Sequence, residues 1–284
     1  MVRNFHRHIR AALVRWSVVI LCVSAFLIVS CKVDVLGLFG SSDFDGRFAE
    51  RDSFRFLTSA ELHPSFAAPY SFVVITDTHI DGGDAHGLEK IGDVVAADAS
   101  IKFIVVTGDI TQGGYRQDLE KFITIAKSLP VPVYPVIGNH DIYFGNWSVW
   151  KDLIGSTTYR VESPDTTLLI LDSANASFGK GQLDWLDSRL NSARKNTFIF
   201  THDNLFTESM GDFQAVADIR ERARMLSMLK GRGDAVFAGH VHRRIIREAG
   251  GVQYITIEDF RDHSIYCVVQ VDVSGNISWE FKKL

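Results

Sequence analysis

Short apolar runs of strand length recur along the chain from Ser71 onward, and their apolar residues follow one another almost without interruption. Such runs are typical of strands that are buried on both faces, because a half-exposed strand alternates apolar and polar residues instead. The runs are SFVVIT, KFIVVT, VYPVI, TLLIL, TFIFT and AVFAG. They predict the buried strands of an α/β domain.

Between several of these runs, apolar residues recur three and four positions apart, which places them on one face of a helix. The segments DLEKFITIAKSL, LDWLDSRLNSA and IRERARMLSML have this spacing, and Pro130 ends the first of them. The expected buried faces are Leu119, Phe122, Ile123 and Ala126; Leu183, Leu186, Leu190 and Ala193; and Ile219, Ala223, Leu226 and Leu229. The C-terminal segments RIIREAGGVQYITIEDF and SIYCVVQVDVSGNISWEF have Gly and Ser-Gly-Asn turns, which predict hairpins and an antiparallel C-terminal portion.

Residues 1–30 have the composition of a targeting segment. A cationic stretch with four arginines precedes the uncharged apolar residues 16–30, as in the n-region and h-region of a secretory signal peptide. The sequence IVSC, which ends at Cys31, resembles the lipobox of bacterial lipoproteins, whose cysteine carries lipid. This resemblance implies a protein held in the bacterial cell envelope, at the outer membrane or the periplasmic face, by lipid on Cys31. An uncleaved transmembrane anchor and an ordinary signal peptide are the alternatives.

The rest of the chain divides into two segments. Residues 31–70 are rich in turn residues, charges and phenylalanine, and we expect a tether that packs partly on the domain. Residues 71–284 are expected to form the domain itself. With 284 residues in the chain, 46% of them hydrophobic and 23% charged, one large domain with a sizeable core is the expected organisation.

Charge and cysteine content narrow the possible functions. The formal net charge is −4 and the formal charges of residues 1–30 are all positive, so the remainder is more acidic still. Proteins that bind nucleic acid generally need a basic face, so no stable nucleic-acid partner is expected. Cys22 leaves with a cleaved signal peptide and Cys31 carries lipid, so Cys267 remains as a buried apolar residue without a disulfide partner.

Polar side chains follow five of the apolar runs, at the point where each run ends. The sequences DTH, GD, GNHD, HD and GHVH come directly after these strands. In open α/β sheets, ligands bind outside the carboxyl ends of the strands, so the five segments are expected to converge on one crevice. Carboxylates and imidazoles without thiolate suit Zn, Fe or Mn, and there are too many of them for one ion. The pattern therefore predicts two metal ions, bridged by a carboxylate and a hydroxide.

In this order and at these strand ends, D-x-H, G-D, G-N-H-D, a single His and G-H-x-H resemble the motifs of the calcineurin-like metallophosphoesterase family, from Ser71 to about Arg244. The resemblance implies a four-layer α/β/β/α sandwich with mixed sheets and an active site at the C-terminal ends of the strands. It also implies two divalent or mixed-valence ions and a bridging hydroxide that acts as the nucleophile. The implied residues are Asp77, His79 and His242 on the first ion; Asp109 between the ions; Asn139, His202 and His240 on the second; His140 as phosphate contact and proton donor; and Asp141 as the residue that positions the loop.

Two departures from the family's branches bear on the substrate. The protein-phosphatase branch has G-D-x-V-D-R-G where this chain has GDITQGG, so Gln112 replaces an aspartate and the following arginine is missing. We therefore expect a phosphodiesterase that acts on a small-molecule phosphoester. Cyclic nucleotides, glycerophosphodiesters, nucleotides and phospholipid headgroups all fit as substrates. The diesterase branch commonly has His-His-Pro where this chain has His202, Asp203 and Asn204, which leaves the residues behind the metal ligands open.

Two alternatives to this function remain, a phosphomonoesterase of the same family and a non-catalytic envelope module that retains the fold. Histidines outside the motifs, at positions 63, 86 and 263, are interpreted as ordinary residues. Arg243 and Arg244 follow the last motif, where they either touch the substrate phosphate or lie on an exposed strand face.

Overall fold

The computed structural model describes residues 44–206 and 215–284. The expected signal peptide, the lipid-bearing Cys31 and the alternative transmembrane anchor lie outside the described residues. In the part of the chain that the structure describes, no helix combines the length and the apolar character needed to cross a bilayer.

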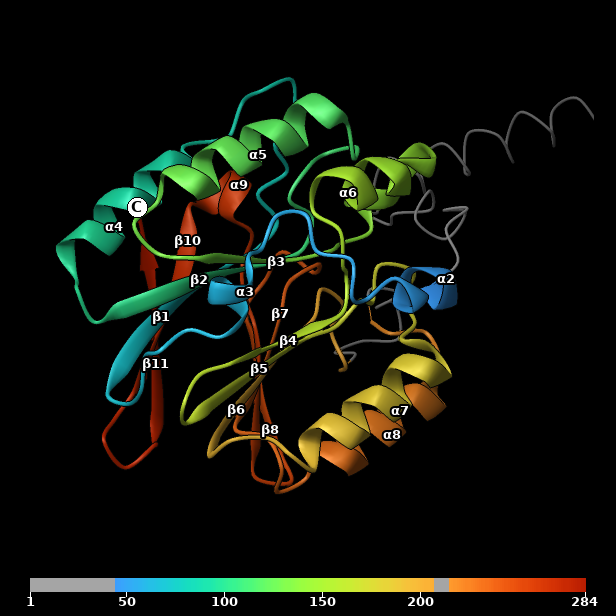
Figure 1. Cartoon of the computed structure of the whole chain (residues 1–284), viewed down its shortest axis with the longest axis vertical. Coiled ribbons are helices and arrows are strands. Elements are labelled where there is room, and N and C mark those ends of the chain that lie inside the picture. The colour runs from blue at the N-terminus through green and yellow to red at the C-terminus, as the bar shows by residue number, and fades with distance from the viewer. Residues whose placement is uncertain (1–43, 207–214) are drawn as a thin grey trace, which may run out of the picture. The chain divides into compact units, whose positions relative to one another are not determined.

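The first sheet has five strands in the order β11–β10–β1–β2–β3. Strands β1 (Tyr70–Ile75), β2 (Ile101–Thr107) and β3 (Val133–Val136) run parallel. The hairpin of β10 (Ile265–Val271) and β11 (Ile277–Lys283) joins them antiparallel to β1, as predicted for the C-terminal portion (Figure 1). The carboxyl ends of three parallel strands therefore lie at one edge of this sheet.

The second sheet has six strands in the order β4–β5–β6–β7–β9–β8. Its strands are β4 (Tyr159–Glu162), β5 (Thr166–Ile170), β6 (Asn196–Phe200), β7 (Ala235–Ala238), β8 (Ile245–Ala249) and β9 (Val252–Thr256). Strands β5, β6, β7 and β9 are parallel, and the edge strands β4 and β8 are antiparallel to their neighbours. The six apolar runs are all strands, whereas β4 was not predicted because it is short and its burial alternates.

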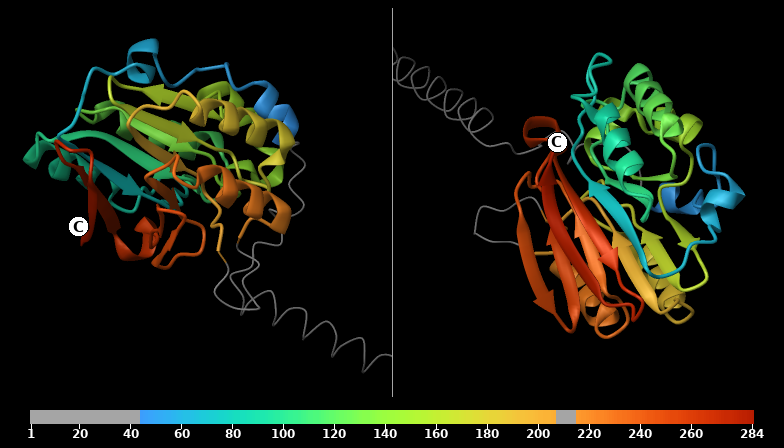
Figure 2. Two further views of the ribbon diagram at one scale, coloured as in Figure 1. Left: turned by 90° about the horizontal axis from the view of Figure 1, so that it is seen from below. Right: turned by 90° about the vertical axis from the view of Figure 1, so that its left-hand side faces the viewer.

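Helices cover the outer faces of both sheets, which gives the predicted four layers (Figures 1 and 2). Helices α4 (Ile91–Ala97) and α5 (Arg116–Ser128) cover the first sheet, with α6 (Trp147–Leu153) beside α5. Helices α7 (Gly179–Leu190) and α8 (Ile219–Leu229) cover the second. The shorter helical turns are α2 (Phe44–Ala49), α3 (Ser59–Leu62), η2 (Leu88–Lys90), η3 (His140–Gly145) and α9 (Phe260–His263).

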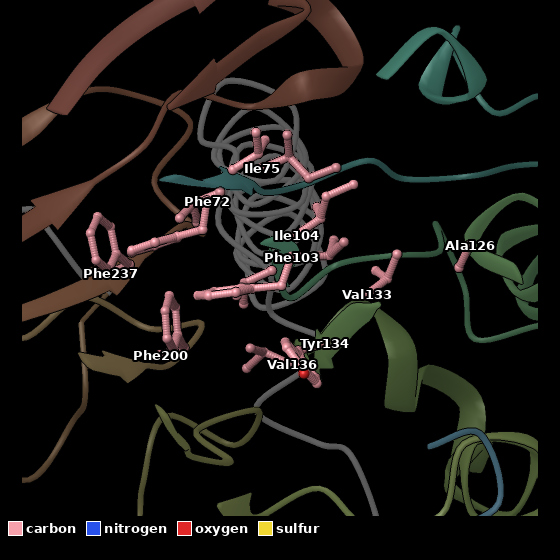
Figure 3. Close-up of a cluster of buried hydrophobic side chains, with 14 of the residues drawn as sticks. Phe72, Ile75, Phe103, Ile104, Ala126, Val133, Tyr134, Val136, Phe200 and Phe237 are labelled. Atoms are coloured by element: carbon pink, nitrogen blue, oxygen red, sulfur yellow. The ribbon is translucent and has the colours of Figure 1, made fainter. Parts of the chain in front are cut away.

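A layer of phenylalanines fills the space between the two sheets (Figure 3). The ring of Phe72 on β1 stacks on Phe103 with a centroid distance of 4.7 Å, and its edge contacts Phe198 and Phe237 across the sheets at 5.1 and 5.8 Å. Each such pair contributes about 0.5–1.5 kcal/mol beyond the burial of its surface. This packing fixes the two sheets relative to each other, and with them the strand ends that carry the polar motifs.

Residues 44–70 pack on the domain through a few buried side chains, while most of their other residues are exposed or half-buried. Arg47 on α2 is 1% exposed and binds the buried Asp172 through two hydrogen bonds of 2.7 and 2.9 Å. Phe56 and Leu57 belong to the main core. An arginine can be buried here because the carboxylate that pairs with it, 125 residues away, is brought beside it by the fold.

Leu119, Phe122 and Ala126 of α5 and Leu183, Leu186 and Leu190 of α7 are buried as predicted, whereas Ile123 and Ala193 are half-buried. In α8 the prediction holds for Leu229 and partly for Leu226, but it is wrong for Ile219 and Ala223. Ile219 is 69% exposed and Ala223 is exposed, whereas Met225, Met228 and Leu229 face the core of the second sheet. The sequence of α8 has two overlapping apolar stripes, and spacing alone cannot choose between them. The packing against α7 and the sheet selects the stripe with the methionines.

Candidate metal centre

The polar side chains that follow β1, β2, β3, β6 and β7 meet at the carboxyl edge of the two sheets, as predicted. The residues brought together are Asp77, His79, Asp109, Asn139, His140, His202, His240 and His242. Within the cluster, three sets of carboxylate and imidazole groups lie close enough to share an ion: Asp77, His79 and His242; Asp109, His202 and His240; and, between these two, His79, Asp109 and His140.

The first group contains Asp77, His79 and His242. The Nε2 atom of His242 lies 3.2 Å from Asp77 Oδ1 and 3.3 Å from the Nε2 atom of His79. Asp77 Oδ1 is buried and has no hydrogen-bond partner. A buried carboxylate oxygen without a donor is costly unless a cation neutralises it, so this oxygen is suited to a metal ion.

The second group contains Asp109, Asn139, His202 and His240. The Nε2 atom of His202 lies 3.2 Å from Asp109 Oδ2, 2.9 Å from Asn139 Oδ1 and 3.1 Å from His240 Nδ1. Asp109 Oδ2 also lies 3.9 Å from the Nε2 atom of His79 in the first group. Asp109 is therefore the carboxylate that stands between the two groups.

The separations within both groups fit donors that share an ion. Nitrogen and oxygen ligands bind such a metal at about 2.0–2.2 Å, so neighbouring ligands of one ion lie roughly 3–3.5 Å apart. The ring-nitrogen contacts of 3.1 and 3.3 Å fall in this range. The cluster contains no thiolate, since Cys267 is buried in β10. An imidazole and carboxylate set of this kind suits Zn, Fe or Mn.

Backbone carbonyls fix two of the imidazoles with one nitrogen turned toward the cluster. His202 donates its Nδ1 hydrogen to the carbonyl of Thr107 at 2.9 Å, and His140 donates its Nδ1 hydrogen to the carbonyl of Gln112 at 2.8 Å. The Nε2 atoms are then free to bind a metal or a substrate. Metal-binding histidines in general are oriented in this way by the hydrogen bond of the other ring nitrogen.

Three residues that support the cluster were not predicted from the sequence. Tyr143 accepts a hydrogen bond of 3.1 Å on its hydroxyl from the amide nitrogen of Asn139, which turns the amide oxygen toward His202. Asp203 Oδ1 lies 3.5 Å from the Nε2 atom of His240. Asp203 thus stands behind a metal-facing imidazole at the position where the family's diesterases commonly have their second histidine.

The third supporting residue is Asp259, which follows β9 and is fully buried. Its Oδ1 atom lies 3.7 Å from the Nδ1 atom of His242 and accepts a hydrogen bond of 2.8 Å from His263. His263 was interpreted as an ordinary residue, but it holds this carboxylate. No sequence motif marks Asp259, and only the position of β9 next to β7 brings it to His242.

Asp141 holds together the loops that follow strands β2 and β3 of the first sheet. Its carboxylate accepts hydrogen bonds from the backbone of Thr111 and Gly138 at 2.9 Å and of Ile110 at 3.2 Å. Burial and the neighbouring Asp109 carboxylate raise the pKa of Asp141 to about 6. Asp141 therefore joins the loop after β2 to the loop after β3.

The two carboxylates that face the donors remain ionised. Burial alone would raise the pKa of Asp77, but the imidazoles of His242 and His79 bring it well below the ordinary value. Burial opposes ionisation of Asp109 as well, and His202 and His140 lower its pKa in the same way. The cluster therefore presents two ionised carboxylates to a cation. Bound metal ions would stabilise these negative charges as the imidazoles do here.

Five of the clustered residues have a left-handed backbone that is unfavourable for residues with a Cβ atom. Their φ angles are 52° for Asp77, 43° for His79, 48° for Asp109, 69° for His240 and 52° for His242. Each costs of order 1–3 kcal/mol, and such strain is concentrated at functional sites. The surrounding packing imposes these angles on the loops that carry the donors.

The glycines of the motifs allow the loops to approach each other closely. A Cβ atom at Gly138 would overlap the backbone nitrogen and the carboxylate of Asp109, and one at Gly239 would overlap Thr76 and Asp77. Neither glycine has a positive φ angle. Their role is thus to let the backbone pass next to the carboxylates rather than to permit an unusual turn.

Two further residues considered in the sequence do not contribute donors. His86 contacts the backbone carbonyl of His79 at 3.2 Å from outside the cluster. Arg244 pairs with Glu258 at 2.7 Å and lies over the ring of Phe281, which is the exposed strand-face role rather than a phosphate contact.

Comparisons with known proteins agree with this arrangement. The family model described as calcineurin-like phosphoesterase matches residues 70–244. The chain is 32% identical over 96 residues to a protein of Colwellia psychrerythraea named "Probable cyclic nucleotide phosphodiesterase", which covers 30% of this chain and 36% of the relative. It is 31% identical over 158 residues to a protein of Arcobacter nitrofigilis named "Probable glycerophosphodiester phosphodiesterase GpdQ", which covers 49% of this chain and 56% of the relative. The match spans about a third of the length of the Colwellia protein and a little over half of the length of the Arcobacter protein.

Among solved structures, a dimetal phosphatase from Danio rerio has the same fold. The two superpose with a TM-score of 0.61 at 16% sequence identity, over 76% of this chain and 96% of the zebrafish protein. At this identity the likeness concerns the fold alone.

Proposed function

Because this chain belongs to the calcineurin-like phosphoesterase family, we propose that it hydrolyses a small-molecule phosphodiester at a binuclear metal centre. The observation that carries the proposal is the pair of donor groups that share Asp109 at the carboxyl edge of both sheets. A non-catalytic module that only retains the fold would not need both groups. This chain retains every donor that the family resemblance implies, which supports the enzyme over the module.

Asp77, His79, Asp109 and His242 would hold one ion, and Asp109, Asn139, His202 and His240 would hold the other. The donor types favour Mn, Fe or Zn. When bound, a pair of such ions lowers the pKa of water and neutralises the oxygens of a phosphoryl group. The carboxylate of Asp109 would be shared by the two ions, because it lies 3.9 Å from the Nε2 atom of His79 and 3.2 Å from that of His202.

His140 is the residue that supplies a proton to the leaving oxygen. Its Nδ1 hydrogen is held by the carbonyl of Gln112, so its Nε2 atom faces the cluster, 3.9 Å from Asp109 Oδ2. The ring packs edge-on against His79 and lies 4.3 Å from the ring of Tyr143 at an angle of 40°, and these contacts fix its direction. An imidazole held in this direction is suited to donate a proton as a general acid.

The surroundings of Gln112 favour a diester over a monoester. Gln112 stands where protein phosphatases of the family have an aspartate, and its side-chain oxygen accepts a hydrogen bond of 2.9 Å from Arg261. The guanidinium of Arg261 also pairs with Asp262 at 3.3 Å. Because this arginine is engaged with its neighbours, it does not form a dedicated clamp for the second charge of a phosphomonoester.

The test compares two activated substrates on the metal-loaded protein. We expect bis(p-nitrophenyl) phosphate to be hydrolysed with a higher kcat/KM than p-nitrophenyl phosphate, because the diester has one charge less. A protein treated with chelator serves as the control and should hydrolyse neither. A higher kcat/KM for the monoester would identify a phosphomonoesterase, and no hydrolysis of either would favour the non-catalytic module.

We also propose that lipid on Cys31 holds the protein in the bacterial envelope. The support is the apolar stretch 16–30, which ends in IVS and is followed directly by Cys31. Intact-mass analysis of the protein from membranes should give a chain that begins at Cys31 and carries acyl groups. A mature chain that retains residues 1–30 would show that this proposal is wrong.

A further inference from the structure

Two exposed aromatic rings lie together at the rim of the candidate metal centre. Among the described residues, Tyr115 and Phe144 are the aromatic side chains with the largest exposure, at 49% and 67%. Their rings are nearly parallel, with a centroid distance of 6.1 Å and an angle of 15°. They come from different segments, since Tyr115 precedes α5 and Phe144 lies between β3 and α6. We call this pair the aromatic platform.

The platform is continuous with the site through Tyr143. The ring of Tyr143 lies 4.3 Å from the ring of His140 and 6.0 Å from that of Phe144. Asn146 ties the two segments together, because its amide nitrogen donates a hydrogen bond of 2.8 Å to the carbonyl of Gly113. The platform thus begins one ring away from the residue assigned to the leaving oxygen.

The fold itself gains little from this arrangement. An exposed ring contributes little burial to the core, and Phe144 has a φ angle of 55°, which is unfavourable for a residue with a Cβ atom. The strained backbone and the stacking on Tyr115 hold the ring in the open, beside the site. Exposed aromatic faces that are held in place are suited to stack on a planar ring of a ligand.

We infer that the substrate is a nucleobase-bearing phosphodiester, whose base stacks on the aromatic platform while its phosphoryl group lies at the metal centre. The inference rests on the proposed function and specifies its substrate class. In such a substrate one sugar lies between the base and the phosphate. In the protein one ring, that of Tyr143, lies between Phe144 of the platform and His140. A glycerophosphodiester has no planar ring and would leave the platform without a contact.

The test uses Phe144→Ala, with Phe144→Tyr as the matched variant that keeps an aromatic face. We expect Phe144→Ala to raise the KM for cyclic AMP about tenfold at similar kcat, because base stacking on an aromatic residue is worth roughly this factor or more. The KM for glycerophosphoethanolamine should not change, and Phe144→Tyr should retain the wild-type KM for cyclic AMP. Metal content confirms that each variant has an intact centre.

Equilibrium binding of AMP and of inorganic phosphate distinguishes the inferred base site from the proposed phosphodiesterase function. We expect AMP to bind more tightly than phosphate, and Phe144→Ala to weaken only the binding of AMP. If the protein hydrolyses glycerophosphoethanolamine but AMP binds no better than phosphate, the inference is wrong and the proposed function stands. If no diester is hydrolysed yet AMP binding still depends on Phe144, the base site stands and the proposed function fails. An equal effect of Phe144→Ala on both diesters, or none on either, also contradicts the inference.

Discussion

His140 and Asn139 are neighbours in the chain, but their surroundings assign them different roles. Asn139 faces His202 and Tyr143, whereas the Nε2 atom of His140 faces the open side of the cluster. We expect His140→Ala to keep both metals and to lose roughly 10² to 10⁴ in kcat on an alkyl diester, the usual contribution of general acid catalysis. The loss should be smaller on bis(p-nitrophenyl) phosphate, because p-nitrophenolate leaves readily without a proton.

Metal analysis and both rates check this assignment, with the exposed His63→Ala as the control. An emptied metal site in His140→Ala would show that His140 is a ligand. An equal loss on both leaving groups would show that it only contacts the phosphate.

Tyr143 is a positioning residue for Asn139. In Tyr143→Phe the ring against His140 is kept, but the hydroxyl that holds the amide of Asn139 is removed. We expect metal affinity to fall about tenfold, at the lower end of the effects seen for such supporting residues. Tyr254→Phe is the control, since the buried hydroxyl of Tyr254 has no hydrogen-bond partner. Metal titration of both variants decides the matter, and unchanged affinity in Tyr143→Phe would refute the role.

The sequence was sufficient to predict which side chains converge at the carboxyl edge of the sheets, because the motifs follow apolar strands. It was not sufficient for Tyr143, Asp203 and Asp259. Their contacts depend on the direction of a side chain or on which strands are neighbours, and neither is encoded by local spacing. The exposure of Phe144 depends in the same way on its backbone angle.

At the scale of elements, α2 is a structural part of the domain. Its Arg47 fills the site beside Asp172, and removing one partner of a buried ion pair leaves the other charge without compensation. We expect Arg47→Ala to lower the free energy of unfolding by about 3–5 kcal/mol. Arg55→Ala, at an exposed arginine of the same segment, should change it little.

Denaturant unfolding of the two variants measures this difference. A stability equal to wild type in Arg47→Ala would show that the contact between α2 and Asp172 does not stabilise the domain. The sequence could not reveal the contact between α2 and Asp172, because Arg47 and Asp172 are 125 residues apart and a charged, phenylalanine-rich segment is equally typical of a linker.

The strands were easier to predict than the buried face of α8. A continuous apolar run buries all its residues, whereas α8 has two overlapping apolar stripes and either could face the core.

At the scale of the whole molecule, the candidate centre joins the two sheets. Asp77, Asp109 and Asn139 come from the first sheet, and His202, His240 and His242 come from the second. The phenylalanine layer holds the two sheets at a fixed separation, and the metals would connect them at the carboxyl ends of their strands. Metal binding and the stability of the fold are therefore expected to be coupled.

The most direct test of the account is the number of metal ions bound per chain. The purified protein is loaded with Mn²⁺, freed of unbound metal and analysed for metal and protein content. We predict two equivalents per chain, because Asp109 lies between two sets of donors, one with Asp77, His79 and His242 and the other with His202 and His240. A content that stays at or below one equivalent after saturation would contradict the binuclear centre, and with it the proposed mechanism.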